Sequence, residues 1–230
     1  MFTTPELAAL ALTLKLASVS TGILLLLGMP LAWWLARSRA RYKALVEALV
    51  AAPLVLPPTV LGFYLLILFA PQAPLGSLWQ SITGSQLAFS FAGLVAGSVI
   101  YSLPFVVQPI QSSFEKIPEL TLNTASALGA SDWDRYLNVV IPMCKRSIIA
   151  AAALGFAHVL GEFGIVLMIG GNIPGETQVL SIALFEHVEA LDYGSAHRIA
   201  LGLLAFSLLI LILLYALGRG SRVPVIYAKR

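Results

Sequence analysis

The sequence contains little charge and almost no cysteine. Asp, Glu, Lys and Arg make up 11% of its 230 residues, whereas soluble domains carry about 25%. Hydrophobic residues make up 59% and the mean hydropathy is +0.90, so we exclude a soluble globular domain. The single cysteine, Cys144, excludes an intrachain disulfide and a cysteine-based metal site. The phosphate-binding motif G-x-x-x-x-G-K-[ST] is also missing, so we expect no ATP hydrolysis by this chain.

Five apolar runs are long enough to cross a hydrocarbon layer about 30 Å thick, which takes about 20 helical residues. They lie at about 7–36, 44–70, 87–110, 147–170 and 199–217. We therefore predict an all-α polytopic membrane protein with five transmembrane helices in one domain, residues 1–230. The first run lacks the basic start and the Ala-x-Ala-like site of a cleaved signal peptide, so we expect it to be retained.

A further apolar stretch, residues 178–191, is too short to be a sixth span. It has about 14 residues, whereas a span needs about 20, and it carries Glu186, His187 and Glu189. We expect an interfacial or re-entrant helix there.

The basic residues gather in three segments, which follow the first, third and fifth runs. These segments contain all Lys and Arg residues except Lys15 and Arg198. Because basic loops stay in the cytoplasm, this pattern predicts an N-terminus outside and a C-terminus inside. We attribute the net charge of +3 to this bias and expect a lipid bilayer, not nucleic acid, as the partner surface.

The longest segment on the predicted inner side, residues 117–142, has the pattern of two short helices. Leu120, Thr124 and Leu128 recur at helical spacing, and Gly129 can supply the left-handed residue that ends a helix. Ser131 can cap a second helix with an apolar stripe. That stripe consists of Trp133, Tyr136, Leu137, Val140 and Ile141. Small residues at the joint permit close approach by a partner protein; a helix lying on lipid headgroups is the alternative.

These residues resemble the EAA loop of ABC-importer permeases, with Gly129-Ala130 at the joint and Ile141-Pro142 downstream. In that family the loop docks into a groove of a cytoplasmic ATPase. The family's usual Glu aligns with Asn123 and its usual Asp with Leu128. The resemblance implies a set of ATPase-contacting residues: Asn123, Ala125, Gly129, Ala130, Trp133, Ile141 and Pro142.

Two further stretches resemble molybdate permeases: PLVLPPTVLG at 53–62 and LGEFGIVLMIGGNIPGET at 160–177. The resemblance implies a type I ABC importer permease that works as a homodimer in the cytoplasmic membrane of a prokaryote. The implied substrate is molybdate or tungstate, with sulfate, thiosulfate or another oxyanion as the alternative. The implied partners are two ABC ATPase subunits, which would hold ATP and Mg, and a periplasmic or extracellular oxyanion-binding protein. We expect no cofactor and no metal on this chain.

Four residues inside the apolar runs are candidates for the pathway or its gate. Pro57 and Pro58 lie deep in the second run, and prolines are tolerated in lipid where helices pack together or line a wet cavity. His158 and Glu162 are four residues apart, so one helix face would carry both. Ionisable groups at membrane depth usually face a pathway; a His–Glu pair that holds the helix against a neighbour is the alternative.

The predicted outer loop contains Asn172, Pro174 and Gly175. Glycine-rich turns can present backbone N–H groups to anions. We favour the alternative, a tight turn that faces a binding protein.

Two other classes of protein would also explain some of these features. An intramembrane hydrolase would use His158 and Glu162, but they form H-x-x-x-E and not the H-E-x-x-H zinc motif. An ATP-independent carrier would explain the spans but not the loop at 117–142. The sequence therefore predicts a transport subunit and not an enzyme.

Overall fold

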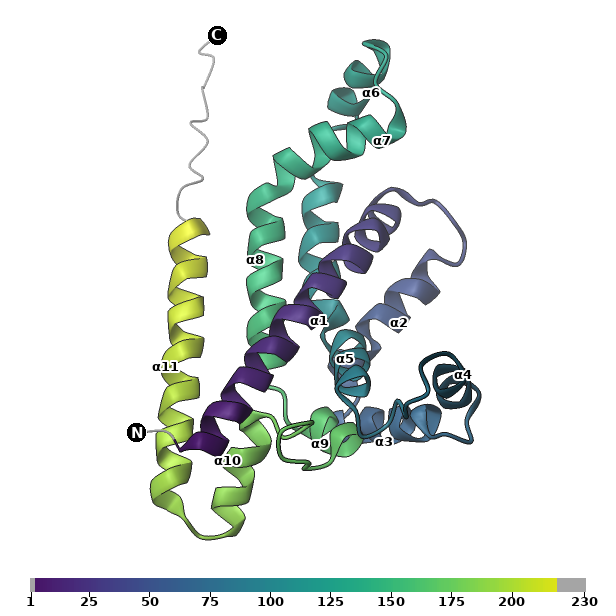
Figure 1. The fold of residues 1–230 in the computed structure, drawn as a ribbon. Coiled ribbons are helices and arrows are strands. Elements are labelled where there is room, and N and C mark those ends of the chain that lie inside the picture. The colour runs from purple at the N-terminus through teal and green to yellow at the C-terminus, as the bar shows by residue number, and fades with distance from the viewer. Residues whose placement is uncertain (1–2, 219–230) are drawn as a thin grey trace.

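The computed structural model describes residues 3–218, and within them the chain folds into helices without any strand (Figure 1). The helices are α1 (Thr4–Arg37), α2 (Lys43–Val55), α3 (Pro58–Phe69), α4 (Pro74–Thr83), α5 (Phe91–Glu115), α6 (Glu119–Ala127), α7 (Asp132–Arg135), the π-helical turn η1 (Tyr136–Val140), α8 (Ile141–Leu160), α9 (Gly164–Gly170), α10 (Leu180–Glu189) and α11 (Tyr193–Gly218). The all-α prediction is confirmed.

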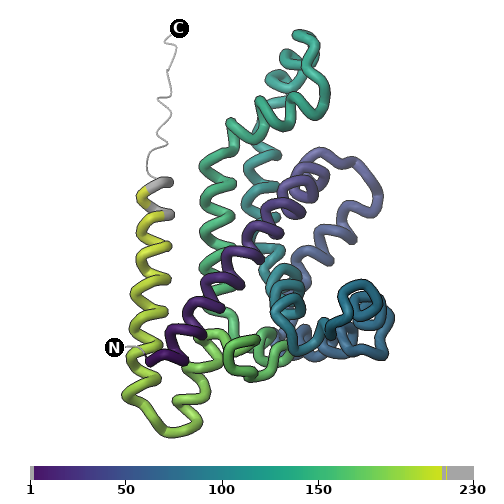
Figure 2. The backbone as a smooth tube through the Cα atoms, viewed as in Figure 1, coloured from purple at the N-terminus to yellow at the C-terminus, as the bar shows by residue number. Residues whose placement is uncertain are grey.

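Four helical segments are long and apolar enough to cross a membrane alone, which are α1, α5, the continuous helix Asp132–Leu160 and α11 over Tyr193–Leu213. A fifth candidate is the pair α2 and α3, which is bent by 115° (Figure 2). Leu56 and Pro57 cause this break. Each precedes a proline, which disfavours helical backbone, and their ψ angles are 134° and 136°.

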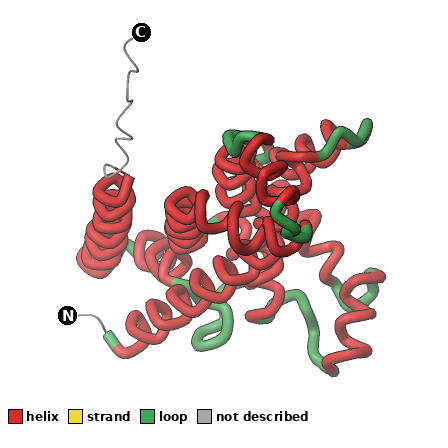
Figure 3. The backbone as a smooth tube through the Cα atoms, turned by 90° about the horizontal axis from the view of Figure 1, so that it is seen from above, coloured by secondary structure: helices red, strands yellow, loops and turns green. Residues whose placement is uncertain are grey.

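The core lies where α1 crosses α5 and α8, and these three helices form the most extensive contacts in the chain. The buried side chains there are mostly Leu, Val, Ile and Ala, including Leu24, Val106, Val107 and Ala151. By contrast, α11 packs mainly on α10 and α8 and stands at the edge of the bundle (Figure 3). Only 11% of its apolar window is buried within the chain, so lipid or another chain must cover the rest.

The predicted fourth span, 147–170, is divided between two helices. The helix that starts at Asp132 runs through η1 to Leu160, and after a break at residues 161–163 the short helix α9 follows. Gly161 has φ −90° and ψ 1°, and Phe163 has φ −128° and ψ −57°. Glu162 therefore lies outside the helix that carries His158.

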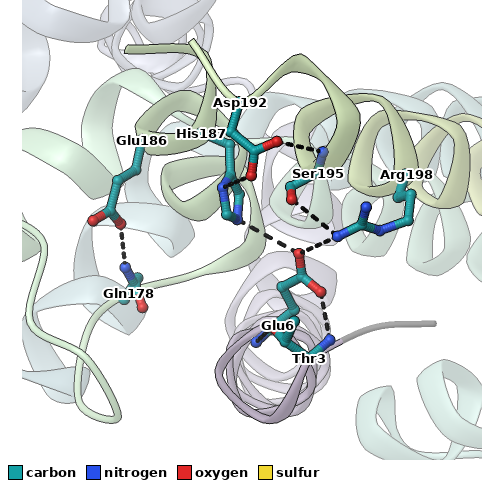
Figure 4. A network of polar contacts seen from close by, with 8 residues as sticks. All are labelled: Thr3, Glu6, Gln178, Glu186, His187, Asp192, Ser195 and Arg198. Carbon is teal, nitrogen blue, oxygen red and sulfur yellow. Dashed lines mark hydrogen bonds and ion pairs between the residues drawn. The ribbon is translucent and has the colours of Figure 1, made fainter. Parts of the chain in front are cut away.

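The stretch 178–191 forms α10, which has 10 residues and is about 15 Å long, too short to cross a membrane. It packs beside the start of α1, where the Leu180 N–H donates to Thr13 Oγ1 at 2.8 Å. The buried Glu6 carboxylate forms ion pairs with His187 Nε2 at 3.5 Å and Arg198 at 3.6 Å (Figure 4).

Asp192 completes this polar network at the start of α11. His187 Nδ1 lies 3.5 Å from its carboxylate, and the Ser195 N–H donates to it at 3.2 Å (Figure 4). Hydrogen bonds from Ser195 hold the pKa of Asp192 below its usual value. The network joins α1, α10 and α11 at the end of the bundle opposite α6 and α7 (Figure 1).

Candidate functional site

The two broken spans meet at their breaks beside an open cavity of about 630 Å³. Its walls come from the start of α3, the middle of α5, the end of α8 and the 161–164 break. The lining residues are Pro58, Thr59, Tyr101, Ala157, His158, Gly161, Glu162, Phe163 and Gly164. Three of the four candidates inside the apolar runs, Pro58, His158 and Glu162, therefore line one cavity.

Gly164 allows the two breaks to approach each other. A Cβ atom added there would lie 2.9 Å from Cβ of Pro58. One turn further along α3, a Cβ added at Gly62 would lie 2.8 Å from Cβ of Met168. Real Cβ atoms essentially never come so close, so these positions require glycine unless α3 and α9 separate.

His158 contacts α5 and not Glu162. Its Nδ1 lies 2.9 Å from Ser102 Oγ, and its ring stacks on Phe105 with centroids 3.8 Å apart. The Tyr101 ring also contacts it, with ring centroids 5.0 Å apart. Among the described residues no hydrogen bond or ion pair joins His158 to Glu162, because α8 ends between them.

The Glu162 side chain is 5% exposed, and both of its carboxylate oxygens lack a hydrogen-bond partner within residues 3–218. Its main-chain carbonyl accepts a bond from Ser181 Oγ at 2.6 Å, which fixes the backbone of the break. An unpartnered carboxyl group in a cavity is costly to keep in the interior, and such groups concentrate at functional positions.

The contact between Ser102 and His158 brings together a hydroxyl group and an imidazole, as in hydrolases. However, Ser102 is fully buried and does not line the cavity. Its hydroxyl oxygen cannot reach a substrate in the cavity, so this pair does not form a nucleophile and base. Among residues 3–218 there is also no group of three or more His, Cys, Asp or Glu side chains that could hold a metal ion.

The 117–142 segment has the predicted joint. Gly129 has φ +93°, and the Ala130 N–H donates to the Ala125 carbonyl at 3.0 Å, which closes α6. Ser131 Oγ accepts from the Asp134 N–H at 3.2 Å and caps α7. Both predictions, the left-handed glycine and the serine cap, are confirmed. The second helix does not end at the loop, however, but continues through η1 into α8.

This joint carries apolar side chains with no cover. Leu120, Leu128 and Trp133 are 76%, 84% and 67% exposed. They belong to α6, α7 and the joint between them, and these two helices lie at the far tip of the molecule (Figure 1). Asn123 and Gly129 are exposed as well, while Ala125, Ala130 and Ile141 are partly buried. Pro142 is exposed in the first turn of α8. Exposed apolar groups of this size in a loop mark a contact surface.

Arg37, at the end of α1, ties that helix to the root of the loop. Its guanidinium donates to the carbonyls of Phe114 and Ile117, both at 3.0 Å. The ring of Trp33 lies under the guanidinium at 5.2 Å and contacts Phe114 and Tyr136. Arg37 and these aromatic rings therefore connect α1, α5 and η1 in one cluster of side chains.

The outer-loop candidates form a compact turn. The N–H groups of Glu176, Thr177 and Gln178 all donate to the Ile173 carbonyl, and the Thr177 hydroxyl donates to the Gly170 carbonyl. These N–H groups are not free for an anion, which favours the tight turn. Asn172 Nδ2 donates to Glu186 of α10, while Pro174 and Gly175, with φ +79°, are exposed.

Sequence reasoning missed the contribution of α5 and of Arg37. Thr59, Tyr101, Ser102 and Phe105 surround the candidates that it found. A signal was present, since Ser98 and Ser102 recur at helical spacing inside an apolar run and are both buried. In the sequence Arg37 is simply the first of the basic residues that follow the first apolar run, whereas its hydrogen bonds to Phe114 and Ile117 make it structural.

The fold and the site define a helical membrane transport subunit with two interrupted spans around a central cavity. Residues 28–223 match the family described as "Binding-protein-dependent transport system inner membrane component", and the chain belongs to that family. The predicted family resemblance is confirmed.

Within this family, the chain is similar to permeases of molybdenum and sulfate transport systems. The chain is 55% identical over 214 residues to the molybdenum transport system permease protein ModB of Azotobacter vinelandii, covering 93% of this chain and 95% of that protein. It is 32% identical to the protein of the same description from Escherichia coli K12, covering 96% and 97%. The sulfate transport system permease protein CysT of Escherichia coli K12 is 34% identical over 92% of this chain and 76% of that protein.

Solved structures share the fold. A bacterial alginate ABC transporter in complex with its pentasaccharide-bound periplasmic protein contains a chain that superposes with a TM-score of 0.75 at 15% identity, over 94% of this chain and 79% of that one. The MetNI methionine ABC transporter gives a TM-score of 0.72 at 17% identity, over 95% and 99%. These structures show the shared fold, and the family match together with the 55% identity to a molybdenum transport permease makes the chain an ABC importer permease.

Proposed function

We propose that two copies of this chain form the pathway through which an ABC importer carries molybdate across a prokaryotic cytoplasmic membrane. The 55% identity to the molybdenum transport permease of Azotobacter vinelandii, over 93% of the chain, carries this proposal. It extends across both interrupted spans and the 117–142 segment. Tungstate is carried equally well in this proposal, because both are tetrahedral dianions of nearly the same size.

The central cavity is the middle of that pathway. One chain walls the cavity from α3, α5, α8 and the 161–164 break, and a second copy closes its open side. His158 and Glu162 act at the gate and not as the binding site, because a carboxylate repels an oxyanion. The break at Pro57 and Pro58 is the hinge that lets α3 move with α9.

Two ATPase subunits bind the exposed tips formed by α6 and α7, one on each copy. Asn123, Ala125, Gly129, Ala130 and Trp133 meet the ATPase, while Ile141 and Pro142 support the loop from α8. ATP and Mg are held by those subunits. Their closure moves the loop and, through Arg37 and the aromatic cluster, the spans.

In this arrangement the α6–α7 end faces the cytoplasm and the α9–α10 end faces outward. The N-terminus is then outside and the C-terminus inside, in agreement with the basic segments. A periplasmic or extracellular oxyanion-binding protein delivers its ligand to the outer end, beside Asn172, Pro174 and Gly175.

Reconstitution tests the proposal directly. Proteoliposomes that contain the chain, its ATPase and its binding protein should accumulate labelled molybdate only with ATP inside and binding protein outside. Unlabelled tungstate should compete, and sulfate should compete weakly. ATP-independent uptake, or failure of the ATPase to co-purify, would overturn the assignment.

Sulfate is the second candidate substrate, because a sulfate transport permease matches 92% of the chain at 34% identity. The same uptake assay decides between them. Uptake of labelled sulfate that exceeds uptake of molybdate would favour this alternative.

A further inference from the structure

Between the central cavity and α6, one face of α5 carries polar residues that an apolar span should not expose. Gln108, Ser112 and Glu115 are all exposed, although α5 is a candidate membrane span. Gln108 lies about 10 Å along the axis from the end of α5, at 1.5 Å per residue, and inside the run 87–110 that the sequence predicts to cross the membrane. Exposed amide and hydroxyl groups at that depth must face water or protein, since lipid offers no hydrogen bonds.

This face is continuous with the cavity. Tyr101, Phe105, Gln108, Ser112 and Glu115 follow one another at intervals of four and three residues, so they form a single stripe along α5. Tyr101, the first residue of the stripe, lines the central cavity. Pro109 has no N–H for the Phe105 carbonyl, which needs another partner such as pathway water.

At its Glu115 end the stripe opens into a second cavity of about 310 Å³ between α2 and α5. Gln108, Gln111, Ser112 and Glu115 line it from α5, and Glu47 lines it from α2. Gln111 Nε2 donates to Glu47 at 2.9 Å and to Glu115 at 3.0 Å, and so joins the two helices. Lys43 lies 3.6 Å from Glu47 and forms an ion pair with it.

We propose that this stripe of α5 lines the inner half of the substrate pathway, from the central cavity to the cytoplasmic mouth. Gln108 and Ser112 offer neutral donors to a passing tetrahedral oxyanion, which can bind them weakly and leave. Glu115 and Glu47 lie at the exit, where their charge disfavours return of the anion. Gln111 positions both carboxylates by its two hydrogen bonds.

This inference rests on the proposed function, but it can be tested without ATP or a known substrate. Cys144 is the only cysteine and is 4% exposed, so a Cys144→Ala background gives a thiol-free chain. In it, Gln108→Cys and Ser112→Cys should react with a membrane-impermeant methanethiosulfonate reagent in inverted vesicles. Thiolates form in water and not in lipid, so Leu26→Cys on α1, where Leu26 is 70% exposed, should react at least tenfold more slowly.

Equal and slow reaction at all three positions would overturn the lining role, provided that the variants still bind the ATPase. If the stripe reacts as expected but the vesicles transport no oxyanion, the substrate assignment fails and the lining face stands. The two failures are therefore distinguishable.

The role of the exit carboxylate has its own test in transporting proteoliposomes. In the Glu115→Gln variant, oxyanion inside the vesicles should inhibit import at a concentration about threefold lower than in the parent, because the charge that repels the returning anion is gone. A change of about threefold is the size expected for one exposed charge interaction. Glu119→Gln, an exposed acidic residue of α6 outside the cavity, is the matched control. Equal internal inhibition in both variants would overturn the release role.

Discussion

Glycine acts differently at the two ends of the helix that runs from Asp132 to Leu160. At the loop tip, a Cβ added to Gly129 would meet nothing within 4 Å, and only its φ of +93° requires glycine. At the central cavity, Gly164 has no positive φ, and the contact with Pro58 requires glycine there. The tip keeps open surface for a partner, whereas the cavity is built by close packing within the chain.

The largest effect is expected at the packed end. Gly164→Val should separate α3 from α9 and lower the free energy of unfolding by about 1–3 kcal/mol, as overpacking does. We expect a lower melting temperature in detergent and loss of uptake. Gly22→Val in α1 is the matched control, because nothing lies within 4 Å of a Cβ there. A Gly164→Val protein that melts and transports like the parent would remove the distinction between the two ends.

At the open end, Gly129→Val should leave the helices inserted and folded but separate ATP hydrolysis from uptake. The strain of a β-branched residue at positive φ is about 1–3 kcal/mol and falls on the loop. The ratio of uptake to ATP hydrolysis in proteoliposomes measures the uncoupling, and the melting temperature shows whether the helices remain folded. Gly129→Asn should keep more activity, because asparagine tolerates left-handed backbone. Unchanged ATP-dependent uptake in Gly129→Val would contradict the coupling role.

Between the ends, Arg37→Gln tests whether α1 follows the loop. Loss of charge-assisted hydrogen bonds to two carbonyls should lower the free energy of unfolding by about 1–2 kcal/mol at this partly exposed site. Uptake per ATP hydrolysed should fall several-fold. Arg39→Gln, which changes an exposed arginine two residues further on, should behave like the parent. The same ratio of uptake to hydrolysis in Arg37→Gln would show that α1 is not part of the coupling.

The smallest effect on stability is expected for Glu162→Gln. The carboxylate makes no hydrogen bond of normal length and angle within residues 3–218, although the Ser98 side chain lies close to it. The substitution therefore loses at most one weak contact, and the melting temperature should stay equal or rise. Uptake should change if Glu162 is a gate. Thermal unfolding and uptake measured on the same preparation separate the two roles, and parental values in both would dismiss the residue.

Local patterns predicted the loop well because local interactions determine it. The Ser131 cap depends on a residue three positions away, and the left-handed Gly129 depends on its own backbone. The overall class of fold followed from composition and from the length of the apolar runs.

The cavity could not be predicted in the same way. The i, i+4 spacing put His158 and Glu162 on one helix face, but α8 ends at Leu160, where α9 packs against α3. His158 instead contacts Ser102 and Phe105, more than fifty positions away in sequence. Such contacts depend on how helices pack, and periodicity within one segment contains no information about them.

The unbroken helix from Asp132 to Leu160 has a mechanical consequence. Its 29 residues span about 43 Å, so a tilt of about 5° about one end displaces the other by about 4 Å. A modest rotation imposed at the α7 end thus becomes a displacement larger than a water molecule beside His158. The chain can in this way act as a lever arm, in which a small stroke outside the bilayer opens or closes a passage within it.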